Sequence, residues 1–157
     1  PFPARQRTPG EKERVCQCLP KKQTAPVVWL LDHGLSLSAP IAAALGRNGD
    51  LAALLSDASQ AAKDESLATA AINRQRVAAR LCLEAGADPN RYMPAHSHST
   101  PLHQAVANGD LETVKVLVAH GARLDIEDTM WRGTPLGWAM HGKQAEIEAY
   151  LRGVTER

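Results

Sequence analysis

The sequence predicts an all-α repeat protein in which helix-turn-helix units stack side by side into a solenoid. The segment TPLHQA at residues 100–105 recurs in altered form as TPLGWA at residues 134–139. A second landmark, Gly-Ala-Asp at 86–88, recurs as Gly-Ala-Arg at 121–123. A period of about 34 residues is typical of stacked supersecondary units and not of one globular core. Such stacks present a long surface, so the period favours binding over chemistry.

Residues 100–132 form the most complete unit. Thr100 and Pro101 suit a helix start, because the hydroxyl can accept from first-turn amides and proline at the first helical position loses no needed N–H. Apolar residues then follow at helical spacing, and a second apolar stripe follows the break at Asn108-Gly109-Asp110. Asn and Gly tolerate positive φ, and Gly121 ends the second helix.

This unit resembles the ankyrin repeat, whose signature is T-P-L-H-x-A at a period of about 33. The matching residues are Thr100, Pro101, Leu102, His103, Ala105, Asn108, Gly109, Leu111, Val114, Leu117, Gly121 and Ala122. The resemblance covers about residues 26–153 and implies a solenoid of helix-turn-helix units, each followed by a hairpin finger. It predicts an ankyrin repeat domain over 26–157, with about four units that are atypical at both ends, where one face must meet water.

The units before residue 100 match the same pattern less closely. Residues 27–37 suit a second helix and its loop. Residues 40–55 suit a helix pair that turns at Asn48-Gly49-Asp50, with one residue extra before the turn, and residues 56–63 leave little room for a finger. Residues 64–88 align without gaps at an offset of 35 from the complete unit.

The last unit spans residues 134–152 and has two departures from the pattern. Its turn at His141-Gly142-Lys143 is interpreted as one residue short, and Gly137 replaces the signature histidine. Trp138 stands where the preceding unit has a polar residue. We expect these residues to form a final helix pair.

Residues 1–25 are predicted to be a poorly ordered, basic, proline-containing leader. Residues 1–26 hold five of the ten prolines and a charge balance of +4, whereas residues 27–157 carry −3. A basic arm for an acidic partner or for nucleic acid is the alternative. The leader lacks an aromatic ladder and a groove-reading helix, so nucleic-acid binding is not expected.

We expect a monomeric, cytoplasmic protein, since the odd number of cysteines and the Leu-rich surroundings of Cys82 suggest a reducing compartment. Charged residues make up 22% and hydrophobic residues 44%, which is ordinary for a globular chain, while the 4% of aromatic residues suits thin helix pairs. The sequence has no run of eighteen apolar residues that would span a membrane and no signal-peptide core. Cys82 lies in a helical stripe as a small hydrophobe, and the spacing of Cys16 and Cys18 is too short for a structural zinc site.

No coherent catalytic set is present, so neither an enzyme nor a cofactor is expected. The serines lack the glycine-flanked turn of an activated nucleophile, and no phosphate-binding loop occurs. His96 and His98 could hold a metal with a third ligand, but their segment contains no carboxylate. The family resemblance gives His103 a structural hydrogen-bonding role. The acidic cluster Asp125, Glu127 and Asp128 is interpreted as part of a solvated hairpin.

Binding through a surface is therefore the predicted function. In the ankyrin family, partners usually contact the finger tips and inner helices that line the concave face. Interface centres are enriched in Tyr, Trp, Met and Arg. The candidate partner-binding residues are Arg91, Tyr92, Met93, Gln104, Asn108, Met130, Trp131, Arg132, Trp138 and His141. Met130, Trp131 and Trp138 would form an anchor pocket for a peptide or helix, unless Tyr92 and Trp131 simply pack on adjacent fingers.

These observations predict a non-catalytic adaptor or scaffold that binds another protein. One alternative is a regulatory ankyrin segment of a larger multidomain protein or enzyme, which the absence of a starting methionine leaves open. Another is a metal- or nucleic-acid-binding protein that uses His96 and His98 or the basic leader.

Overall fold

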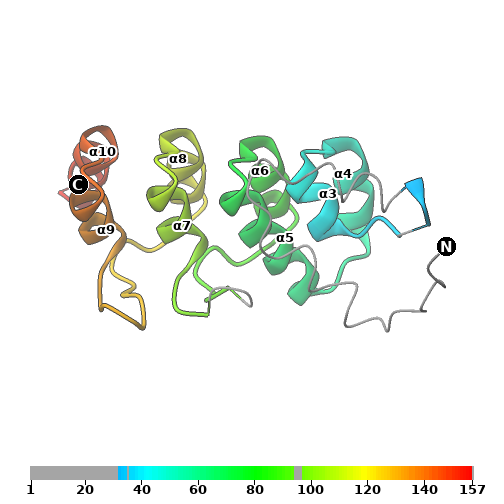
Figure 1. Ribbon diagram of the computed structural model, residues 1–157, viewed down its shortest axis with the longest axis horizontal. Coiled ribbons are helices and arrows are strands. Elements are labelled where there is room, and N and C mark those ends of the chain that lie inside the picture. The colour runs from blue at the N-terminus through cyan, green and yellow to red at the C-terminus, as the bar shows by residue number, and fades with distance from the viewer. Residues whose placement is uncertain (1–31, 35, 94–96, 157) are drawn as a thin grey trace, which may run out of the picture.

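The computed structural model describes residues 32–34, 36–93 and 97–156, and over these residues it shows a row of stacked helix pairs (Figure 1). The pairs are α3 (Ala39–Leu45) with α4 (Asn48–Ser56), α5 (Gln60–Ile72) with α6 (Arg76–Glu84), α7 (Pro101–Ala107) with α8 (Leu111–Ala119), and α9 (Pro135–His141) with α10 (Ala145–Thr155). The predicted all-α repeat solenoid is confirmed. The predicted leader lies outside the described residues, as does most of the predicted helix at 27–37.

Side-chain oxygens cap the starts of several helices. Thr134 Oγ1 accepts a hydrogen bond from the Gly137 N–H at 3.2 Å, as the Thr-Pro motif predicts. Ser59 Oγ accepts from the Ala62 N–H at 3.3 Å in the same way. Local chemistry therefore sets where these helices begin.

Two loops project to the same side of the stack as fingers, one after α6 and one after α8 (Figure 1). Single backbone hydrogen bonds close them, from Met93 N–H to the Ser99 carbonyl at 3.1 Å and from Asp128 N–H to the Gly133 carbonyl at 2.9 Å. No strand is assigned in the described residues. No finger follows α4, because α5 begins four residues after α4 ends.

The turn inside each helix pair depends on one residue in the left-handed backbone region. These residues are Gly46 (φ 68°), Arg74 (φ 56°), Gly109 (φ 65°) and Lys143 (φ 53°). Two predicted turns are therefore wrong. Asn48 opens α4 instead of starting the turn, because Gly46 already supplies the left-handed residue. The last turn is not short, since Lys143 follows Thr134 by the same nine residues that separate Gly109 from Thr100.

Side-chain amides tie each pair to the pair before it. Gln75 Nε2 donates to the Ala44 carbonyl at 3.4 Å, and Gln144 Nε2 donates to the Val106 carbonyl at 3.0 Å. Asn108 Nδ2 donates to the Ile72 carbonyl at 2.9 Å. These bonds satisfy carbonyls at helix ends that have no partner within the helix. The Asn108 amide, predicted to meet a partner, is thus engaged between repeats.

The core consists of small and aliphatic side chains shared between neighbouring pairs. Ala42, Ala70, Ala105 and Ala139 have no exposed surface, which lets successive inner helices approach closely. Cys82 is also fully buried, and burial raises the pKa of its thiol to about 12. A thiol with this pKa remains protonated and unreactive at neutral pH.

Lys143→Gly is expected to raise the free energy of unfolding by about 0.5–1 kcal/mol, because a left-handed backbone is strained for any residue with a Cβ. Lys143→Ala is the matched control, since it removes the charge and keeps the strain. Urea denaturation of both variants measures the effect. An equal increase in the free energy of unfolding for Lys143→Ala and Lys143→Gly would contradict the conclusion that the backbone of Lys143 is strained.

Candidate protein-binding site

The carboxylate of Asp128 organises the finger between α8 and α9. Its Oδ1 accepts from the backbone N–H groups of Met130 at 2.9 Å and Trp131 at 2.7 Å. Its Oδ2 accepts from the Gly133 N–H at 2.8 Å and from the indole Nε1 of Trp138 at 2.9 Å. The interpretation of Asp128 as a solvated acidic residue is wrong, since it is only 1% exposed.

The hydrogen bonds to Asp128 decide its protonation state. Burial alone would raise the pKa of this carboxyl, but the N–H groups of Trp131, Trp138, Gly133 and Met130 together lower the pKa to about 2. A carboxylate that accepts several N–H bonds is stabilised in its charged form. Asp128 is therefore an anion at neutral pH.

His103 joins α7 to the same finger. Its Nδ1 accepts from the Thr100 N–H at 3.3 Å, so Nε2 carries the proton and donates to the Gly133 carbonyl at 3.1 Å. The ring is fully buried, and this burial is the main reason that the pKa of His103 is lowered. The structural role that the family resemblance implies for His103 is confirmed.

Four aromatic rings meet beside these hydrogen bonds. The Trp131 and Trp138 ring centroids lie 6.0 Å apart, with the rings inclined at 66°. His98 lies 6.0 Å from Trp131 and 6.4 Å from Trp138, and His103 lies 5.1 Å from Trp138. Trp131 nevertheless keeps 67% of its surface exposed. It contacts the other rings without being covered by the neighbouring finger.

A hollow of about 620 Å³ opens beside the two tryptophans, and we name it the tryptophan hollow. It is lined by Ala107, Trp131, Gly133, Gly137, Trp138, His141, Gly142 and Gln144. These residues come from the inner helices α7 and α9, the turn that follows α9 and the last finger. None is Asp, Glu, Lys or Arg, and Trp131, Trp138 and His141 give the hollow three aromatic rings.

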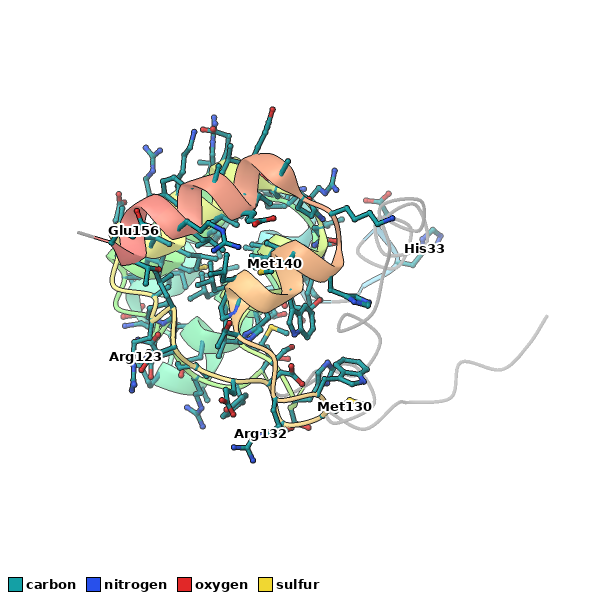
Figure 2. All side chains as sticks on the ribbon, turned by 90° about the vertical axis from the view of Figure 1, so that its left-hand side faces the viewer. His33, Arg123, Met130, Arg132, Met140 and Glu156 are labelled. Atoms are coloured by element: carbon teal, nitrogen blue, oxygen red, sulfur yellow. The ribbon has the colours of Figure 1, made fainter. Side chains whose placement is uncertain are left out.

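Three of the five predicted site residues on the last finger and α9 line this hollow. Trp131, Trp138 and His141 line it. Met130 is 61% exposed at the finger tip, and Figure 2, viewed from the C-terminal end of the stack, shows Arg132 at the same tip. Arg132 Nε pairs with Glu127 Oε2 at 2.7 Å, which holds its guanidinium against the finger.

The remaining candidates lie elsewhere or are occupied. Arg91 pairs with the buried carboxylate of Asp64 at 3.0 Å, and Tyr92 donates its hydroxyl to the Glu127 carbonyl at 2.8 Å. Gln104 Nε2 donates to Ser99 Oγ at 3.0 Å. Met93 is only 2% exposed, so its predicted role in partner contact is corrected. It lies in the interior because the finger after α6 folds its apolar residue inward.

In the described part of the chain, no three His, Cys, Asp or Glu side chains are grouped to hold a metal ion, and His96 lies outside that part. No helix there has both the length and the apolar character needed to cross a bilayer.

Comparison with known proteins shows the family. A model of ankyrin repeats in three copies matches residues 40–129 and again residues 69–153, so the chain belongs to the ankyrin repeat family. Its repeats are a non-catalytic protein-interaction module, as predicted.

The chain is similar to several kinase inhibitors over 77 residues. Human cyclin-dependent kinase 4 inhibitor B is 39% identical there, over 49% of this chain and 54% of that protein. Human cyclin-dependent kinase inhibitor 2A is 38% identical, over 49% of this chain and 48% of that protein. The chain thus spans about half the length of the curated relatives it matches.

Asp128→Asn is expected to lower the free energy of unfolding by about 1–3 kcal/mol. The new amide keeps one acceptor oxygen but turns its NH₂ group toward N–H donors that then lack an acceptor. Asp125→Asn, at an exposed position of the same finger, serves as the control. Chemical denaturation followed by tryptophan fluorescence measures both, and equal stabilities would contradict the role of Asp128.

The stability advantage of the wild type over Asp128→Asn is expected to depend on pH. The folded-state pKa of about 2 lies below the ordinary 3.8, so the stabilisation is complete above about pH 4 and is lost as pH falls toward 2. Other carboxyl groups titrate in both proteins and cancel in the difference. Denaturation series between pH 6 and pH 2 test this, and a difference that stays constant throughout would contradict it.

Proposed function

We propose that the chain is an adaptor that binds another protein through its concave face, with the tryptophan hollow as the anchor point. The exposure of Trp131 carries this proposal. A tryptophan that is 67% exposed leaves a large apolar surface in water, although Asp128 holds the backbone of its turn firmly in place. Exposed apolar surface on a rigid support is typical of interaction sites.

The surroundings of the hollow support a protein ligand. Met130, which is 61% exposed and precedes Trp131 in the chain, offers an adaptable apolar contact. The hollow is large enough for one big side chain together with adjoining backbone. This proposal describes a monomer in the cytoplasm, where reducing conditions suit the free thiol of Cys82. It holds equally for repeats that form the regulatory segment of a longer protein.

A cyclin-dependent kinase is a more specific second candidate for the partner. The similar proteins are named as inhibitors of such kinases, and the similarity spans 77 residues. Purified cyclin-dependent kinase 4 is therefore the first named protein to test for binding. Absence of binding would remove this candidate and leave the adaptor proposal intact.

Trp131→Ala is expected to weaken partner binding at least tenfold, because truncation of a central interface tryptophan usually costs more than about 1.4 kcal/mol. Its unfolding free energy should change little, since the side chain is mostly exposed. Tagged wild-type and variant chains are compared for proteins captured from lysate and for affinity to the purified kinase.

Val77→Ala is the matched control, because Val77 is also an exposed apolar residue (48%) but lies on α6, outside the hollow. It should capture the same proteins as the wild type. Full capture by Trp131→Ala would contradict the proposed surface, whatever Val77→Ala captures.

A further inference from the structure

A buried negative charge lies at the indole edge of Trp138, one of the residues that line the tryptophan hollow. The Oδ2 atom of Asp128 lies 2.9 Å from Nε1 of Trp138, whose ring lines the hollow. All four hydrogen-bond donors to this carboxylate are neutral N–H groups. Among the described residues no Lys or Arg pairs with it, and the nearby Arg132 is engaged by Glu127. In the described part of the chain, this charge is therefore not neutralised by a salt bridge to Lys or Arg.

The two indole rings add electron-rich faces near that charge. The face of an aromatic ring is the negative part of its quadrupole and attracts cations. Donation of the Trp138 N–H to an anion increases the electron density of that indole. The second ring, Trp131, stands at 66° to it with most of its surface open. Both features favour a positive ligand.

The shape and lining of the hollow distinguish among positive groups. Gly133, Gly137 and Gly142 line the hollow and place no side chain in it. A guanidinium is planar, weakly hydrated and stacks on aromatic faces, while its in-plane N–H groups can stay in water. A lysine ammonium is compact and strongly hydrated, and the hollow has no carboxylate on its surface to replace that water. An acidic side chain would meet the like charge of Asp128.

We propose that the tryptophan hollow binds an arginine side chain of the partner, with the guanidinium stacked on the exposed indole face of Trp131 and in contact with Trp138. This inference rests on the proposed function and names the residue type that the hollow recognises. The buried Asp128 acts through its field and through Trp138, without touching the ligand.

A comparison of arginine with citrulline tests the contribution of the ligand's positive charge separately from its shape. The full ¹⁵N-labelled chain is titrated with three peptides, acetyl-Gly-Ser-X-Ser-Gly-amide, in which X is arginine, citrulline or norleucine. Citrulline keeps the planar shape of arginine but is neutral. The arginine peptide should shift the indole N–H resonances of Trp131 and Trp138 and bind about fivefold more tightly than the citrulline peptide.

The Trp131→Leu variant provides the matched control, because leucine keeps an apolar side chain at the finger tip and removes the π face. The preference for arginine over citrulline should fall to less than about twofold in this variant. Unchanged preference would overturn the stacking geometry that we propose.

Two further results would overturn the arginine assignment. They are equal or tighter binding of the citrulline or norleucine peptide, and no shift of either indole resonance with any peptide. The adaptor proposal is judged separately, by whether Trp131→Ala loses captured protein. Failure of the arginine assignment is thus distinguishable from failure of the proposed function.

Discussion

The carboxylate of Asp128 and its four N–H donors are the interaction on which the candidate site depends. Without these donors a buried carboxylate would be strongly destabilising, and with them it is held as an anion. Two of the bonds close the turn that presents Trp131, and a third fixes the indole of Trp138. The exposed position of Trp131 is therefore a consequence of a rigid, polar interior and not of a loose loop.

The solenoid supplies the frame for that interaction. Each helix pair contacts its neighbours, and side-chain amides satisfy carbonyls at the helix ends across successive pairs. His103 extends this arrangement to the finger through the Gly133 carbonyl. Gly133 itself has little freedom to change, since a Cβ there would lie 3.0 Å from both Asp128 Oδ2 and the Trp138 ring. The site thus combines residues from α7, one finger and α9.

Much of the fold could be predicted from the sequence because repeat contacts are local and recur at a fixed spacing. The wrong predictions concern the turns inside the helix pairs, where residues of different types adopt the same left-handed backbone conformation. Lys143 adopts the left-handed turn that Gly109 adopts, and nothing in its side chain indicates this. The sequence did contain a signal for this turn, because Lys143 and Gly109 follow their Thr-Pro motifs at the same spacing. At the candidate site, the aromatic residue types were enough to propose Trp131 and Trp138 as binding residues. The burial of Asp128 and Met93 could not be predicted in this way, because it depends on how each finger closes in three dimensions. The frequent use of Asp to bond its own turn was the one hint for Asp128.

Cross-saturation NMR on the labelled chain in complex with a captured partner tests the central claim most directly. Irradiation of the unlabelled partner reports which protons of this chain lie against it. The account predicts strong attenuation at the indole N–H groups of Trp131 and Trp138 and at amides around Gly142, with α6 and α8 unaffected. Attenuation confined to α6, α8 and α10, with the Trp131 indole at full intensity, would contradict it.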